Sequence, residues 1–298
     1  MRDFEYEAPQ SLDQAIQLMA VRDGRARPLA GGTDLIDHVR TGRLEPDLLV
    51  DIKKIPELNV LELGSGGLRL GAAVPCYRIY NNSQVAQQYS ALADSCRIIG
   101  GIQIQSRASV GGNLCNSGPA ADSSPSVIVL GGMCVIAGPK GTRTVPAEEF
   151  CTGPGKNVLS PGELLVEVRF PARRPQSGSH YRRLIPRNEM DIAVVGVAAS
   201  VELDAGQKHF VSARIALGAV APTPILATAA GDALTGKPVN DETIAAAAEA
   251  ARKIVAPISD MRGTKEYRIH VTGVLVERVV RAAVARSRGE IVDHRPGH

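Results

Sequence analysis

Residues 28–35 read Pro-Leu-Ala-Gly-Gly-Thr-Asp-Leu, a short apolar run that leads into a glycine pair and then into a helical pattern. Glycines let a backbone approach a ligand closely, and the N–H groups at the start of a helix attract phosphates. Taken alone, however, the glycine pair is explained at least as well by an ordinary turn. It lacks the G-x-G-x-x-G spacing of nicotinamide dinucleotide sites, which disfavours a site of that class.

The segments on either side of this motif predict a small α/β unit. Ser11 is a suitable N-cap for a helix, and the apolar residues that follow it recur at helical spacing. A strand is expected over 27–30, a helix over about 33–40 and a buried strand over 48–52. Together these elements make a first subdomain of about residues 1–55.

A second α/β unit is expected over about residues 56–175. Alternating leucines on each side of a Gly-Ser-Gly-Gly turn predict a hairpin over 60–74. A helix is expected over 89–99 and a strand over 163–171. Between them lies a glycine-dense polar segment, 100–125, which reads as a long loop, and loops of that length inside a domain are usually functional or disordered.

The segment 100–125 carries side chains that suit a dinucleotide. Ser109, Asn113 and the backbone N–H groups near them could surround a pyrophosphate, and Asp122 could accept hydrogen bonds from ribose hydroxyls. Together with the glycine pair at 31–32, this loop suggests a long dinucleotide held between two lobes. Two unrelated loops explain the same residues equally well.

A Pro-, Gly-, Ser- and Arg-rich stretch at 171–179 is the expected linker to a C-terminal α+β domain at 178–290. Two β-rich segments and two long helices are predicted in that domain. The strands are expected over 193–203 and 210–220, and the helices over 241–255 and 265–288.

Composition excludes several classes of protein. The 298 residues include 34 Lys and Arg against 31 Asp and Glu, and this balance does not suit a chain whose main partner is nucleic acid. No run approaches the roughly 20 apolar residues of a membrane helix. Five scattered cysteines and six scattered histidines predict no disulfide framework, metal site or catalytic triad. We therefore expect a cytoplasmic protein.

The two glycine motifs together point to a family. AGGTDL at 30–35 and QIQSRASVGGNLCNSGPAADSSP at 103–125 resemble the FAD-binding medium subunits of molybdenum hydroxylases, the xanthine dehydrogenase and carbon monoxide dehydrogenase type. The resemblance covers nearly the whole chain. It includes GELLVEVRFP at 162–171, Asp-Ile-Ala at 191–193 and the pattern Ser-Asp-x-Arg-Gly-x-x-x-Tyr-Arg at 259–268.

The resemblance implies a fold and a cofactor site. The fold would be a vanillyl-alcohol-oxidase (PCMH)-type FAD-binding domain at 1–175, of two α/β subdomains, followed by a carbon monoxide dehydrogenase flavoprotein C-terminal-like domain. The cofactor would lie between the two subdomains and that C-terminal domain. Residues matching the first pyrophosphate loop are Pro28, Leu29, Ala30, Gly31, Gly32, Thr33, Asp34 and Leu35. Residues matching the second loop are Ser109, Val110, Gly111, Gly112 and Asn113.

Four further residues match outlying FAD positions of the family. Asp122 matches the acidic contact on the ribose side, Leu165 and Arg183 match positions near the adenine and the flavin, and Ile192 falls where a side chain covers the isoalloxazine ring. From the residues alone, Leu165 also reads as strand core, Arg183 as a surface charge and Ile192 as a packing residue.

The resemblance also implies a role and partners. The chain would pass electrons from the [2Fe-2S] clusters of a small iron–sulfur subunit through FAD to NAD⁺, a quinone or O₂, while a large molybdopterin subunit hydroxylates the substrate. A dimer of heterotrimers is expected, with no catalytic side chain in this subunit. A self-contained flavin oxidoreductase and a non-catalytic nucleotide-binding scaffold remain the alternatives.

Two departures from the family pattern stand out. Val74 and Pro75 occupy the place where a threonine is common, so a polar contact there is in doubt. The inserted cysteine cluster of some members is missing, so no iron–sulfur centre is expected in this chain. Cys115 is expected to be a packing residue beside the second loop.

Overall fold

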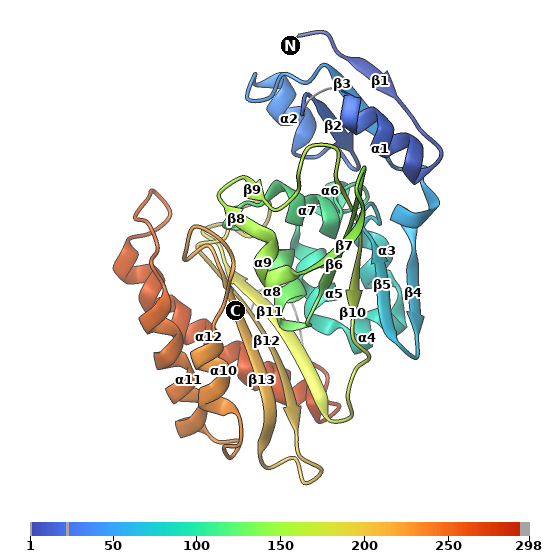
Figure 1. Cartoon of the computed structure of the whole chain (residues 1–298). Helices are drawn as coiled ribbons and strands as arrows, with labels where there is room; N and C mark the ends of the chain where they lie inside the picture. Colours follow the sequence, from blue (N-terminus) through green and yellow to red (C-terminus); the bar gives the residue numbers. More distant parts are fainter. Residues whose placement is uncertain (1, 22–23, 293–298) are drawn as a thin grey trace.

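The computed structural model describes residues 2–21 and 24–292. Figure 1 shows three units in chain order, with the N-terminal unit at the top, a larger unit in the middle and the C-terminal unit below and to the left. Each unit contains its own sheet, and each has its own cluster of buried apolar side chains. This α+β architecture agrees with the expected fold class.

The first unit is a three-stranded parallel sheet in the order β1-β3-β2. Its first helix begins as predicted, because Ser11 Oγ accepts a hydrogen bond from the Gln14 N–H at 3.3 Å. Gly42, with φ of +71°, follows the last helix of the unit and lies in the left-handed region that suits a helix end. The elements are β1 (Glu5–Glu7), α1 (Leu12–Val21), β2 (Ala26–Leu29), α2 (Leu35–Arg40) and β3 (Leu48–Asp51).

The second unit is an antiparallel sheet in the order β4-β5-β10-β6-β7, with helices packed against it. The predicted hairpin is formed by β4 and β5. The elements are η1 (Pro56–Asn59), β4 (Leu61–Gly64), β5 (Gly67–Gly71), α3 (Cys76–Asn81), α4 (Ser83–Gln88), α5 (Ser90–Ile98), α6 (Ile102–Gln105), α7 (Val110–Asn116), α8 (Ser123–Val129), β6 (Met133–Gly138), β7 (Gly141–Pro146), α9 (Ala147–Phe150), β8 (Cys151–Gly153), β9 (Lys156–Asn157) and β10 (Leu164–Phe170).

The prediction of a long loop over 100–125 was wrong. The segment folds into the short helices α6, α7 and the start of α8. Ser109 caps α7 by accepting a hydrogen bond from the Gly112 N–H at 3.0 Å. All seven residues of α8 are buried, so tertiary packing outweighs the weak helix propensity of its serines and proline.

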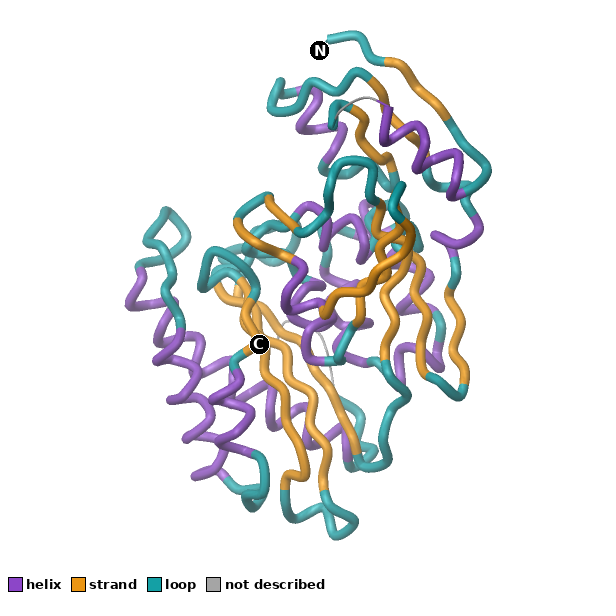
Figure 2. Tube along the Cα trace, in the orientation of Figure 1, coloured by secondary structure: helices purple, strands orange, loops and turns teal. Residues whose placement is uncertain are grey.

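The third unit is an antiparallel sheet in the order β11-β12-β13-β14, and α10, α11 and α12 cover one of its faces (Figures 1 and 2). The other face packs against α5 and α8 of the second unit. Side chains alternate accordingly along β12, with Val197 in the core under the helices and Ala198 in the core of the second unit. The elements are β11 (Ser177–Leu184), β12 (Val195–Leu203), β13 (Phe210–Gly218), β14 (Ile225–Leu226), α10 (Thr228–Leu234), α11 (Asp241–Ile254) and α12 (Lys265–Ser287).

The expected linker at 171–179 is shorter than predicted, because β11 begins at Ser177. The polar residues 177–179 are the start of this strand, which neighbouring elements bury. A Cβ atom on Gly178 would lie 2.1 Å from the Ala283 carbonyl oxygen, so the strand and α12 meet backbone to backbone. In the described ranges, no helix is both long enough and apolar enough to span a membrane.

Candidate functional site

A cavity of about 900 Å³ lies between the first unit and the second. Its lining residues all fall between Met19 and Leu165, so both of the first two units contribute and the third does not. A cavity of this size suits a large organic ligand. The predicted residues that line it are Pro28, Ala30, Gly31, Gly32, Thr33, Asp34, Leu35, Ser109, Gly111, Gly112, Asn113 and Leu165.

The loop between β2 and α2 forms one wall. A Cβ atom on Gly31 would lie 1.9 Å from the Arg107 carbonyl oxygen, so this loop is held directly against the backbone that precedes α7. Gly32 has φ of +75°, a conformation that favours glycine. Among the described residues, the N–H groups of Gly31, Gly32 and Thr33 find no acceptor. They remain available to an anionic ligand.

The start of α7 forms the facing wall. The side-chain oxygens of both predicted polar residues already have partners: Ser109 Oγ caps α7, and Asn113 Oδ1 accepts hydrogen bonds from Ser123 N at 3.1 Å and Ser123 Oγ at 2.7 Å. The two glycines therefore contribute backbone surface to the cavity. A Cβ atom on Gly111 would lie 2.4 Å from the Ala72 carbonyl oxygen, whereas one on Gly112 would meet only Ser109 Oγ, at 3.1 Å.

The charge of the lining is biased toward cations. Arg27, Arg43 and Lys156 line the cavity against the two acidic residues Asp34 and Glu163. Arg143 binds both oxygens of Glu163, at 2.8 and 2.7 Å, and these hydrogen bonds hold the pKa of that carboxyl below its usual value. Because Glu163 is already neutralised, the field in the cavity favours an anion.

Both units provide apolar residues to the lining. Leu165 on β10 is 3% exposed and faces the cavity as predicted, although it also belongs to the core of its unit. Ile99 and Ala72 line the same space. Flat aromatic rings bury well against such surfaces.

Asp122 and Arg183 meet each other and do not line the cavity. Asp122 Oδ2 accepts a hydrogen bond from Arg183 Nη1 at 2.6 Å, and Asp122 Oδ1 accepts one from Tyr181 Oη at 2.9 Å. The aspartate is 8% exposed. Burial raises the pKa of its carboxyl, and Arg183 and Tyr181 offset only part of that effect.

Three other predicted residues also lie outside the cavity lining. Leu29 is the last residue of β2, Val110 is buried in the core of the second unit, and Ile192 is 51% exposed just before β12. Leu29 nevertheless lies against the first glycine loop, since a Cβ atom on Gly32 would be 3.0 Å from its Cδ1 atom. Val110 directly precedes Gly111 at the start of α7.

Sequence reasoning missed the stretch 152–164, which lines the cavity over much of its length. It reads Thr-Gly-Pro-Gly-Lys-Asn-Val-Leu-Ser-Pro-Gly-Glu-Leu, with the same density of turn-forming residues as the two motifs that were recognised. That composition, placed between β8 and β10, could have identified it.

Cys115 also lines the cavity. Burial, with a smaller contribution from the neighbouring Cys151, raises the pKa of the Cys115 thiol to about 12. The side chain is therefore a neutral thiol at physiological pH and behaves as a small packing residue. The described residues hold no group of three metal-ligating side chains.

Comparison with known proteins gives a consistent result across the chain. Residues 2–173 match the family model described as the FAD binding domain in molybdopterin dehydrogenase. Residues 180–283 match the model of the carbon monoxide dehydrogenase flavoprotein C-terminal domain.

Similar proteins cover nearly the whole chain. A xanthine dehydrogenase FAD-binding subunit from Escherichia coli O157:H7 is 35% identical over 98% of this chain and 100% of the relative. The carbon monoxide dehydrogenase medium chain of Hydrogenophaga pseudoflava is 32% identical over 95% of this chain and 98% of the relative.

Solved structures are also similar to nearly the whole chain. A carbon monoxide dehydrogenase from H. pseudoflava that lacks the Mo-pyranopterin moiety of its cofactor superposes with a TM-score of 0.91, at 34% identity, over 96% of this chain and 98% of the other. Quinoline 2-oxidoreductase from Pseudomonas putida 86 superposes with a TM-score of 0.88, at 31% identity, over 96% of this chain and 98% of the other.

Proposed function

The chain belongs to the family of FAD-binding subunits of molybdenum hydroxylases, and on that premise we propose that it binds FAD in the cavity between its first two units and passes electrons through the flavin. The electrons would come from the [2Fe-2S] clusters of a partner subunit and leave to an external acceptor. The observation that carries the proposal is the cavity itself, where two glycine loops from different units face each other across a cation-rich space.

The residues of the cavity fit FAD. The free N–H groups of Gly31, Gly32 and Thr33 would hold the pyrophosphate, and the basic lining would balance its charge. Gly112, which has no side chain, would let the pyrophosphate come close to α7. The apolar surface at Ile99 and Leu165 would pack against ring systems. When bound, FAD supplies the electron-transfer chemistry.

The chain's own side chains would bind and orient the cofactor without acting as acid or base. Among the described residues, two carboxylates line the cavity. Glu163 is already paired with Arg143, and the other is Asp34, the N-cap residue of α2. Walls from two units would exclude water from the buried part of the cofactor. In flavoproteins the cofactor usually performs the chemistry, and the protein positions and tunes the cofactor.

The partners proposed for this chain are inferred from its relatives, several of which are medium chains of dehydrogenases. We propose a large molybdopterin-binding subunit and a small iron–sulfur subunit as partners, arranged as a dimer of heterotrimers. The hydroxylated substrate would then bind the large subunit and need not touch this chain.

Anaerobic reduction of the purified chain loaded with FAD tests the proposal. Dithionite should bleach the flavin, whereas an aldehyde or an N-heterocycle should not, until the iron–sulfur and molybdenum subunits are added. Reduction by such a substrate in the chain alone would favour a self-contained oxidoreductase. Failure to bind FAD at all would favour the scaffold alternative.

A further inference from the structure

Residues of the stretch 152–164 line the proposed FAD cavity, although the stretch belongs to neither glycine motif. It starts in the hairpin of β8 and β9, where Gly155, with φ of +69°, turns the chain between the two strands. Figure 1 shows this hairpin beside α7, the helix that carries Gly111 and Gly112. The cavity is therefore built from a third segment of chain besides the two glycine motifs.

Hydrogen bonds hold this hairpin to the end of α7. The Gly155 N–H donates to the Ser117 carbonyl oxygen at 3.0 Å. Asn157 Nδ2 donates to the Cys115 carbonyl oxygen at 2.9 Å and to Ser117 Oγ at 3.4 Å. Asn157 Oδ1 accepts a hydrogen bond from the Leu159 N–H at 3.1 Å. The Asn157 side chain therefore fixes the hairpin, the residues that follow it and the end of α7 relative to one another.

Ser117, to which the hairpin is attached, is itself fixed. It is fully buried and follows α7 with φ of +51°, in the left-handed region that few residues other than glycine adopt. Its Oγ donates to the Leu114 carbonyl oxygen at 3.0 Å, and Leu114 belongs to the core of the second unit. The hairpin is thus held to a buried point of that unit and is not a free surface loop.

Lys156 lies between the two anchored residues of the hairpin, Gly155 and Asn157. Its side chain is exposed and lines the cavity, and its ammonium has no hydrogen-bond or ion-pair partner in the part of the chain that the structure describes. Arg27, another lining cation, differs because its Nη1 already donates to two backbone carbonyl oxygens. The Lys156 ammonium is therefore available to an anionic ligand, on a backbone whose position is set by its neighbours.

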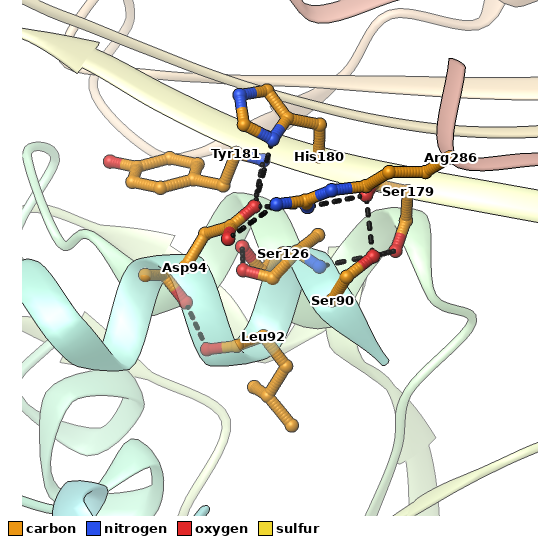
Figure 3. A network of polar contacts seen from close by, with 10 residues as sticks. Ser90, Leu92, Asp94, Ser126, Ser179, His180, Tyr181 and Arg286 are labelled. Carbon is orange, nitrogen blue, oxygen red and sulfur yellow. Dashed lines mark hydrogen bonds and ion pairs between the residues drawn. The ribbon is translucent and has the colours of Figure 1, made fainter. Parts of the chain in front are cut away.

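A cation with a structural role has different surroundings in this protein. Arg286 on α12 donates to both oxygens of the buried Asp94, at 2.5 and 3.0 Å, and to the Ser179 carbonyl oxygen at 2.9 Å (Figure 3). Its charge is neutralised inside the protein, and its side chain is 12% exposed. Lys156 has neither a counter-ion among the described residues nor burial. Folding therefore does not require the Lys156 charge, and its removal should leave the protein folded.

We propose that the stretch 152–164 is a third FAD-binding segment, in which Lys156 binds the phosphates of the cofactor and Asn157 is the positioning residue that holds Lys156 at the cavity. The inference rests on the proposed function and deepens it by assigning a phosphate contact of the second unit to a side chain. Among the described residues, Lys156 is the one Lys or Arg that the second unit contributes to the lining, whereas Arg27 and Arg43 come from the first. A phosphate between the two units would thus meet cations from both.

The test is a titration of the full-length apoprotein with FAD, using Lys156→Ala, Lys156→Arg and the control Lys253→Ala. Lys253 is an exposed lysine on α11, in the unit that does not line the cavity. Lys156→Ala should raise the dissociation constant about tenfold at low ionic strength, and this loss should shrink to about threefold in about 1 M salt, which screens exposed charges. Lys156→Arg and Lys253→Ala should stay within about twofold of wild type, because neither removes the charge at the cavity.

Asn157→Ala tests the positioning role, with Asn82→Ala as its control. Asn82 caps α4 in the same unit by accepting a hydrogen bond from the Val85 N–H at 3.1 Å, and it does not line the cavity. Asn157→Ala should raise the dissociation constant about fivefold and accelerate amide hydrogen exchange at residues 155–159, whereas Asn82→Ala should change neither. Added to Lys156→Ala, Asn157→Ala should cost no more than about a further twofold, because it acts through Lys156.

Unchanged FAD affinity in Lys156→Ala, a loss that is the same at both ionic strengths, or an equal loss in Lys253→Ala would overturn the phosphate contact. Fully additive losses in Lys156→Ala and Asn157→Ala would overturn the positioning role of Asn157. Lys156→Ala truncates an exposed side chain, so the first titration decides the proposal even where Asn157→Ala does not fold. Wild-type apoprotein that binds no FAD would contradict the proposed function instead.

Discussion

At the scale of single residues, the glycines of the two loops have different physical roles. Gly31 and Gly111 lie against backbone atoms of other segments, so their missing side chains are required for the packing of the units. All three glycines line the cavity, but only Gly112 has open space beyond Ser109 Oγ. The sequence motif does not distinguish these glycines, whereas the structure shows which of them has room for a side chain.

Gly112→Val should therefore separate cofactor binding from folding. We expect a folded chain whose FAD dissociation constant rises at least tenfold, because the added methyl groups occupy space near the proposed pyrophosphate position. Gly111→Val, by contrast, should lower the free energy of unfolding by about 1–3 kcal/mol or more through its clash with Ala72. Thermal unfolding and FAD titration of both variants check this, and full FAD affinity in Gly112→Val would remove α7 from the site.

Cys115 should be unreactive in the folded protein. With its pKa raised to about 12, its thiolate population at pH 8 falls about three orders of magnitude below that of a free cysteine. Iodoacetamide labelling followed by peptide mapping should show slow modification of Cys115 in the native apoprotein and rapid modification in urea. Fast native labelling would show that this thiol is activated and not a packing residue.

At the scale of elements, much of the fold could be predicted from local pattern. The helix after Ser11, the hairpin of β4 and β5 and the long helix α12 all follow from capping, turn chemistry and periodicity. The segment 100–125 could not, because its helices are short and their small polar residues are stabilised by burial. For the same reason the start of β11 was taken for a linker. Ser179 Oγ accepts a hydrogen bond from Ala91 N on α5, and the Ser179 carbonyl oxygen accepts one from Arg286 on α12.

The buried carboxylate between α5, β11 and α12 should make this interface sensitive to acid. Burial alone would raise the pKa of Asp94, but the contacts with His180 and Arg286 outweigh that effect and lower it. A carboxyl with a lowered pKa in the folded state stabilises the fold above its unfolded pKa of about 4, and this contribution is lost as the pH falls through the folded value.

Arg286→Gln should consequently lose about 3–5 kcal/mol of unfolding free energy at pH 7, since it removes the arginine partner of a buried carboxylate. The difference from wild type should shrink only as the pH falls through the lowered pKa of Asp94 in the folded wild type, because the carboxyl is then protonated in both proteins. Urea unfolding at a series of pH values measures it. A difference that is constant with pH would show that the ion pair contributes nothing to acid sensitivity.

At the scale of the whole molecule, the candidate site lies at a junction of units. The sequence predicted through the family resemblance that the two glycine motifs share one site, and both motifs line the same cavity. The surroundings of Asp122, Arg183 and Ile192 could not be predicted, because they depend on how β11 and the loop before β12 pack against the second unit. Arg183 of the third unit donates to the Ile98 carbonyl oxygen, next to the lining residue Ile99, although the two are far apart in sequence.

Calorimetric titration of FAD into the full-length apoprotein tests the central claim most directly. We expect saturation at one FAD per chain, with a stabilisation of about 2.7 kcal/mol when free FAD reaches a hundredfold its dissociation constant. A folded apoprotein that binds no FAD, or that binds it without any gain in stability, would contradict it.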